Sequence, residues 1–257
     1  MGLFDNLFER KTCDICGEKC GVLGGTKLKD GRLCSKCAGK ISPWYGYLKN
    51  HTLEEVREHL QYREENYEEV KKFNVTHVVG NGGTTLYLDV NTERMIITSN
   101  GNWRQYNPDI VSFSQIVDYD LKINESKTEI RKKNEDGQLE SYNPKRYDYS
   151  YNFYITVNVN ASFYNTISIK VNGSSIDGYD NDAYEDAFLA SQEICEVLDI
   201  IKSGNYDDLD ETIEYYKNEI AKEKRVYSKT YYADTRAYRK GVDYYKERDP
   251  RRSHYRF

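Results

Sequence analysis

The sequence is poor in the signals that usually reveal a compartment or a chemistry. It contains no apolar run approaching the roughly 20 residues that span a bilayer. Its opening stretch, MGLFDNLFERK, lacks the positively charged start and the long apolar core of a signal peptide. The 4 histidines fall in no catalytic pattern, and neither a Gly-rich phosphate loop nor a His-Glu-x-x-His sequence occurs. We therefore expect a cytoplasmic protein that is not an enzyme, in a compartment where paired cysteines more often hold metal than form disulfides.

The net charge of the chain is small, but the charge is unevenly distributed. The 257 residues carry a formal net charge of -5. Residues 222–257 contain 12 Lys or Arg against 5 Asp or Glu, a net of +7, so the remainder carries a net of -12. This basic, tyrosine-rich end has almost no aliphatic residues and cannot build a core, so we predict a disordered tail over 228–257.

The clearest chemistry in the sequence is a pair of Cys-x-x-Cys motifs. Cys13 with Cys16 and Cys34 with Cys37 form the two pairs, and 17 residues separate them, which is typical of four-cysteine zinc sites. Tetrahedral Zn²⁺ accepts two such pairs at about 2.3 Å per Zn–S bond. Because four protein ligands complete the coordination sphere, we predict one structural Zn²⁺, with no open position for catalysis.

Two neighbours of the motif need their own interpretation. Gly17 follows the second cysteine, where a positive φ would let backbone N–H groups point at sulfur. Cys20 is a fifth thiol, which we interpret as a bystander or an alternative ligand in preference to a redox sensor. Several cations are close enough in sequence to offset the charge of four thiolates: Lys11, Lys19, Lys27, Arg32 and Lys36.

Helical patterns flank the cysteine segment. Residues 1–10 place apolar side chains at helical spacing, which favours a short lid packed on the metal module over a weak membrane anchor. Thr52 and Glu55 form a capping box that opens a helix ending near Phe73. We interpret His51 and His59 as solvated helix histidines, because four cysteines already satisfy the metal.

From residue 75 the hydrophobic period changes from helical to two, as in strands. Asp136-Gly137 is typical of a hairpin tip, and 147–160 alternates most clearly, with Phe153, Ile155 and Val157 on one face. The Gly80–Gly83 segment is interpreted as a tight turn, since it lacks the Lys-Ser/Thr and the helix of a phosphate cradle. The predicted strands are 75–80, 84–90, 93–98, 117–123, 127–132, 138–142, 147–160 and 166–171.

Two further helices are predicted after the strands. Asp182 caps the first, whose apolar face runs from Tyr184 to Ile201 and includes Cys195 as a core residue without a nearby histidine to activate it. The second, about 206–227, carries a stripe of Leu209, Ile213, Tyr216 and Ile220. The predicted fold class is α+β: a small four-cysteine zinc ribbon, a connecting helix, and an antiparallel curled sheet or barrel of about seven strands closed by a C-terminal helix, an order typical of pleckstrin-homology-like (PH-like) or GRAM-like domains. The predicted units are 1–48, 49–74, 75–203, 204–227 and 228–257.

Three long segments carry a resemblance to a known family. They are MGLFDNLFERKTCDICGEKCGVLGG, KLKDGRLCSKCAGKISPW and TLEEVREHLQYREEN, and TTLYLDVNTERMIIT and YNPKRYDYSYNFYITVNVN extend the match to about residue 203. The chain resembles uncharacterised bacterial proteins, common in Firmicutes, that begin with a zinc-ribbon-like domain of unknown function. The resemblance implies a zinc ribbon coupled to a PH-like domain, and it implies no catalytic residues.

Three functions are compatible with these features. The first is a non-enzymatic adaptor that recruits a protein partner, because the metal site is closed and no catalytic constellation is present. The second is nucleic-acid binding through the zinc ribbon and the basic tail, in which Arg and Lys alternate with Tyr. The third is membrane-surface binding by cations of the predicted hairpin, although nearby acidic residues reduce the net positive charge of this segment. These cations are Lys127, Arg131, Lys132, Lys133, Lys145 and Arg146.

Overall fold

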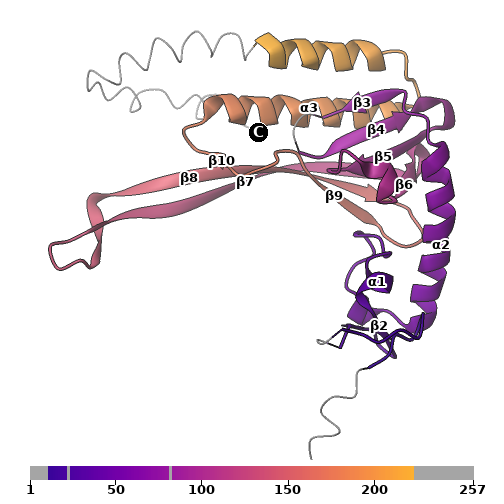
Figure 1. Ribbon diagram of the computed structural model, residues 1–257. Coiled ribbons are helices and arrows are strands. Elements are labelled where there is room, and N and C mark those ends of the chain that lie inside the picture. Colours follow the sequence, from indigo (N-terminus) through magenta and orange to yellow (C-terminus); the bar gives the residue numbers. More distant parts are fainter. Residues whose placement is uncertain (1–10, 22–23, 81–82, 223–257) are drawn as a thin grey trace, which may run out of the picture.

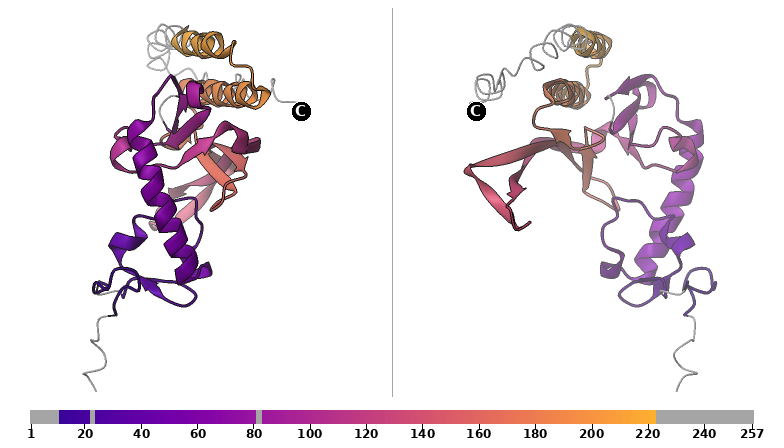
Figure 2. Two further views of the ribbon diagram at one scale, coloured as in Figure 1. Left: turned by 90° about the vertical axis from the view of Figure 1, so that its right-hand side faces the viewer. Right: turned by 60° about the vertical axis from the view of Figure 1, so that its left-hand side comes forward.

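The computed structural model describes residues 11–21, 24–80 and 83–222 (Figure 1). The predicted N-terminal helix over 1–10 and the predicted tail over 228–257 lie outside these residues. The described part is an α+β structure with three antiparallel sheets. A small N-terminal module, the long helix α2 and a larger β body follow one another, and Figure 2 shows α2 running from the module to the body. Within the described ranges, no helix is both long enough and apolar enough to cross a membrane.

The N-terminal module is held by short elements around a small core of its own. Strands β1 (Thr26–Lys27) and β2 (Arg32–Leu33) pair antiparallel, and helix α1 (Ser35–Ala38) and the 3-10 helix η2 (Leu48–Asn50) follow. The buried cysteines pack with Leu28, Leu33, Tyr45 and Val56 in this core.

Helix α2 (Leu53–Lys72) begins at the predicted capping box. The Thr52 amide donates to Glu55 Oε2 over 2.6 Å, and the Glu55 amide donates to Thr52 Oγ1 over 3.3 Å. The side of α2 that is buried is largely polar, and it consists of Val56, His59, Arg63, Asn66 and Val70. The interpretation of His59 as solvated is therefore wrong, because its side chain is fully buried.

The first sheet of the body has the order β3-β4-β5-β6 and is antiparallel throughout. Its strands β3 (His77–Val79), β4 (Thr85–Asp89) and β5 (Arg94–Thr98) lie within the predicted ranges. The fourth, β6 (Ile110–Ser112), was not predicted, because three residues after a proline are too few to show a period. The 3-10 helices η3 (Val90–Thr92), η4 (Trp103–Gln105) and η5 (Phe113–Gln115) connect or follow these strands.

The second sheet is built on two strands that are longer than predicted. β7 (Ile116–Lys133) and β8 (Leu139–Val159) each merge two of the predicted strands into one. β7 contains no Gly or Pro to interrupt it, and β8 accommodates the cis Asn143–Pro144 bond in a four-residue expansion between Ser141 and Arg146. The predicted tip is confirmed, with Gly137 at φ 78° between the two strands.

One core lies between the sheets and helix α3 (Asn181–Ser203). Strands β9 (Thr166–Lys170) and β10 (Ile176–Asp177) pair with β8, whose inward face is the predicted one, with Phe153, Ile155 and Val157 fully buried. The N-cap of α3 is Asp180, two residues before the predicted Asp182. The predicted stripe on the next helix, 209–222, is confirmed, because Leu209, Ile213, Tyr216 and Ile220 are all buried.

The expected single curled sheet of about seven strands, or closed barrel, is not what the described residues form. They form two four-stranded sheets, with β6 and β7 each an edge strand. The two sheets join at one corner, where the Thr84 amide and hydroxyl both donate to the Lys170 carbonyl, over 3.2 and 2.9 Å.

Gly83 makes this corner possible. A Cβ added at Gly83 would lie 2.1 Å from the Val171 carbonyl oxygen and 2.8 Å from that of Lys170. Of the predicted turn at 80–83, Asn81 and Gly82 lie outside the described residues. The Gly80 amide donates to the Glu193 carboxylate over 3.2 Å, so an acidic side chain already faces the segment considered as a phosphate cradle.

We predict that Gly83→Ala lowers the free energy of unfolding by more than about 3 kcal/mol, because the backbones of the two sheets would have to separate at the corner. Gly101→Ala is the matched control, since a Cβ there meets no atom within 4 Å, and it should change stability by less than about 0.5 kcal/mol. Urea unfolding followed by circular dichroism measures both. Equal effects of the two substitutions would contradict the role given to Gly83.

Candidate metal centre and the junction beside it

The four predicted cysteines converge in the N-terminal module. One Sγ atom from each of Cys13, Cys16, Cys34 and Cys37 lies within 4.8 Å of the others. Cys13 and Cys16 lie on a turn closed by the Gly17 amide, which donates to the Cys13 carbonyl over 2.8 Å. The predicted positive φ of Gly17 is confirmed at 72°, although its N–H bonds to this carbonyl and not to sulfur.

The second pair sits at the start of α1. Cys34 is the N-cap of that helix, and its sulfur accepts the Cys37 amide over 3.5 Å. Strand β2 leads directly into Cys34, so the β1–β2 hairpin carries this pair to the first.

The donor set fits a tetrahedral metal ion. Four sulfurs each about 2.3 Å from one ion would be about 3.8 Å apart, and the Cys16 and Cys34 Sγ atoms are 3.7 Å apart. Burial and the neighbouring thiols raise the pKa of Cys37, while burial at Cys13 is outweighed by backbone N–H donors that lower its pKa to about 6. Thiols this close resist ionising together unless a cation neutralises them, which is the role of a bound metal ion.

The fifth thiol is outside the cluster. Cys20 is buried, and its amide donates to the Lys11 carbonyl over 2.7 Å. It packs against Gly25, where an added Cβ would lie 2.8 Å from the Cys20 sulfur. Burial raises the pKa of Cys20, which disfavours the thiolate that both metal binding and redox sensing need. Cys20 is therefore a core residue of the module.

The charge around the cluster is mixed. Lys36, one of the predicted compensating cations, is 3.0 Å from Glu18, and the Arg32 guanidinium donates to the Gly24 carbonyl. Cys195 lies half-buried on α3, and burial followed by nearby carboxylates raises its pKa to about 12, in keeping with a core role.

The module is thus a four-cysteine unit with the geometry of a metal centre. Residues 12–59 match the family model described as a domain of unknown function, DUF4428. No curated protein and no solved structure matches the chain. The matched segment includes all four cysteines and the first turns of α2, which agrees with the extent of the module.

We predict that Cys34→Ser abolishes metal binding and leaves the β body folded, because the body has its own core. Metal content by mass spectrometry should fall from one ion per chain to none. Hydrogen exchange should accelerate in residues 12–50 and stay slow in β8. Cys20→Ala, the matched control, should retain one ion per chain. If this variant loses the ion, Cys20 is a ligand.

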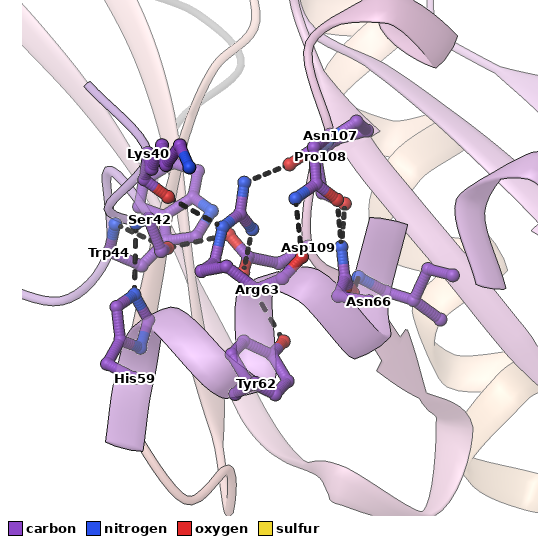
Figure 3. Close-up of polar contacts among 11 residues, drawn as sticks. Lys40, Ser42, Trp44, His59, Tyr62, Arg63, Asn66, Asn107, Pro108 and Asp109 are labelled. Atoms are coloured by element: carbon purple, nitrogen blue, oxygen red, sulfur yellow. Dashed lines mark hydrogen bonds and ion pairs between the residues drawn. The ribbon is translucent and has the colours of Figure 1, made fainter. Parts of the chain in front are cut away.

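Beside the metal module, α2 is fixed to the body by a buried ion pair. Arg63 Nη1 lies 2.6 Å from Asp109 Oδ1, and their side chains are 7% and 1% exposed. Ser42 donates its hydroxyl to Asp109 Oδ2 over 2.6 Å, and Tyr62 donates to Oδ1 over 3.3 Å. Figure 3 shows these side chains converging from α2, from the segment after α1 and from the loop before β6.

Arg63 also reaches backbone on both sides of the junction. Its Nε donates to the Lys40 carbonyl over 3.1 Å, and its Nη2 donates to the Asn107 carbonyl. One turn further on, Asn66 donates to the Pro108 carbonyl over 2.8 Å and accepts the Ile110 amide over 3.0 Å. The guanidinium and the amide thus tie the module, α2 and the first sheet to one another.

An aromatic stack adds to the junction. Tyr45 stacks between His51 and His59 with ring centroids 4.1 Å from each, and Phe163 meets His59 edge-on. The Ser42 amide donates to His59 Nε2 over 3.1 Å, so Nε2 is the unprotonated nitrogen. Burial, then the charges of Arg63 and His51, lower the pKa of His59 to about 4, and the ring is neutral at pH 7.

Two adjoining cavities open on this junction. One, of about 670 Å³, is lined on α2 by Leu60, Tyr67 and Glu68 and on the other side by Lys40 and Tyr106. The second, of about 500 Å³, lies between the module and the sheets. Both are lined by Gly39, Arg63, Tyr106 and Asn107. We call these two cavities the junction cleft.

The cations considered for membrane binding lie on the β7–β8 hairpin and are largely engaged there. Lys132 pairs with Glu140 over 2.9 Å, and Lys145 pairs with Glu129 over 3.5 Å. Lys127 lies 4.0 Å from the centroid of the Tyr147 ring, and Arg146 lies 4.6 Å from that of Tyr142. Because of these contacts, fewer cations of the hairpin are available to bind anionic lipid head groups.

We predict that Asp109→Ala lowers the free energy of unfolding by about 3–5 kcal/mol, because it leaves Arg63 buried without a counterion. Glu69→Ala is the control. It removes a partly exposed carboxylate that pairs with Arg94 over 2.9 Å and with Lys72 over 3.1 Å, and it should cost less than about 1 kcal/mol. Chemical denaturation measures both variants. A cost for Asp109→Ala no larger than that of Glu69→Ala would show that the junction does not depend on the ion pair.

Proposed function

We propose that the chain is a non-enzymatic, zinc-stabilised binding module that recruits a protein partner through the junction cleft. The carrying observation is that the four-cysteine module is joined to the β body through a buried ion pair and that an open cleft lies beside this junction. Clefts between packed units are common binding sites. The zinc assignment rests on the donor set, since four thiolates in a closed tetrahedral arrangement favour Zn²⁺.

The architecture of the body supports the binding role. The body contains a four-stranded sheet, a second sheet with β7, β8 and β9, and the following helix α3, and this order is compatible with a PH-like domain. We propose that the body is an open variant of that fold, in which the short β10 and the extended hairpin are additions. The proposed partner site lies beside the metal module, at the end of β5 and the loop before β6.

The lining of the cleft indicates what it binds. Tyr67 and Tyr106 are 40% and 65% exposed on its walls, and tyrosines are frequent energetic centres of protein interfaces. Leu60 adds apolar surface, while Lys40 and Glu68 provide both signs of charge at the rim. A peptide segment with an apolar or aromatic anchor and flanking polar groups fits this chemistry.

The test is quantitative capture from a lysate of the native host, with and without nuclease treatment, using the full chain as bait. Tyr67→Ala combined with Tyr106→Ala should reduce the recovery of at least one specific partner by tenfold or more. Tyr47→Ala combined with Tyr179→Ala is the matched control, because both tyrosines are exposed and neither lines the cleft. Equal recovery by both double variants would refute a site in the cleft, and partners lost only on nuclease treatment would favour nucleic-acid binding.

A further inference from the structure

The β7–β8 hairpin projects well beyond the rest of the body (Figure 1). Residues 126–133 of β7 and 139–150 of β8 form its outer part, which we call the arm. Here the two strands pair with each other, and β10 adds only two residues, opposite Ser150 and Tyr151. A two-stranded ribbon is marginally stable on its own in water, so an arm of this length calls for a further contact.

The two edges of the arm differ in their capacity to accept another strand. The β8 edge contains Pro144, which has no N–H, and the four-residue expansion at 142–145 interrupts its pairing line. β7 runs for 18 residues without Gly or Pro. Among the described residues, only β8 pairs with β7, so the outer edge of β7 is open along its length.

The net charge of β7 changes from acidic to basic along the strand. Residues 116–125 carry a net charge of -2, from Asp118, Asp120 and Glu125 against Lys122, and residues 127–133 carry a net charge of +3, from Lys127, Arg131, Lys132 and Lys133 against Glu129. Asp118 and Asp120 lie near its beginning, and Lys132 and Lys133 end it, with all four side chains exposed. Asp118 accepts a hydrogen bond from Asn158, and Lys132 pairs with Glu140, but both contacts are on the strand's own sheet. An antiparallel copy of the same strand would bring the acidic half of one β7 against the basic half of the other.

We propose that β7 pairs antiparallel with β7 of a second copy, forming a two-fold symmetric dimer with one continuous sheet. A symmetry axis at Ser126 sets Asp120 opposite Lys132 and Glu125 opposite Lys127, and opposite charges directly across a strand pair are stabilising. An isologous contact of this kind closes at two copies and does not propagate into fibres. The inference goes beyond the proposed function, because it names a partner for a surface separate from the junction cleft.

The charges of an edge strand have a competing role, which is to prevent pairing. The order of positive and negative charges along the strand distinguishes prevention of pairing from promotion of antiparallel pairing. Charges that only protect an edge need no order along the strand, whereas the order on β7 repels a parallel copy and attracts an antiparallel one. The experiment therefore tests the order of the charges and not merely their presence.

The test is the molar mass of the full chain by light scattering across a dilution series, starting with the wild type. The expected mass at high concentration is twice the 30.1 kDa of one chain. Two variants alter opposite ends of β7: Asp118→Lys/Asp120→Lys gives both halves of the strand a net positive charge, and Lys132→Glu/Lys133→Glu gives both halves a net negative charge. Each variant alone should be monomeric, and their equimolar mixture should recover the doubled mass, because both ends of the mixed pair are then complementary.

Two controls keep the result interpretable. Thermal melts establish that each variant is folded, and Lys145→Glu/Asp148→Lys exchanges charges on β8 and should leave the dimer intact. A monomeric wild type, or variants that stay monomeric when mixed, would overturn the dimer and identify the charges as edge protection. Neither result bears on partner capture by the junction cleft, so the proposed function fails only by its own test.

Discussion

The structure depends on one buried ion pair, Arg63 with Asp109. The four cysteines organise only the small N-terminal module, and the sheets and α3 organise only the body. Arg63 connects them, because its guanidinium contacts backbone from both sides while Asp109 also accepts from Ser42 and Tyr62. A buried guanidinium without its carboxylate would be strongly destabilising, so the pair favours the arrangement of module and body in which Arg63 and Asp109 meet. The junction cleft lies beside this pair, and Arg63 is part of its lining.

The sequence was most informative where chemistry or period was local. The Cys-x-x-Cys spacing identified the four cysteines that cluster in the structure, and the Thr52–Glu55 box marked the start of α2. Strict alternation identified the inward face of β8. In each case the interacting residues are close in the chain or repeat at a fixed interval, so the pattern is readable without knowing the tertiary structure. The position of the hairpin tip at Gly137 followed for the same reason.

The features that were missed depend on distant residues. Arg63 and Asp109 are 46 positions apart, and nothing near either one indicates the other. His59 was interpreted as solvated because a polar residue on a helix usually is, yet Val56, His59, Arg63, Asn66 and Val70 follow one another at intervals of three and four. That spacing, read without regard to polarity, would have revealed the buried seam. The predicted strands merge into β7 and β8 for a similar reason. Pairing between the two strands of the hairpin continues through polar residues that, taken alone, suggest a break.

One helix, α2, connects the four-cysteine site to the junction cleft. Helix α2 contributes Val56, in its first turn, to the core of the metal module and Arg63, near its middle, to the ion pair, so one helix takes part in both contacts. Free-energy coupling between two sites is reciprocal. If the metal orders the module against the body, a ligand that tightens the cleft must raise the affinity for the metal by the same factor. In that case, the availability of the ion would set the fraction of molecules in which the cleft has the shape that a partner can bind.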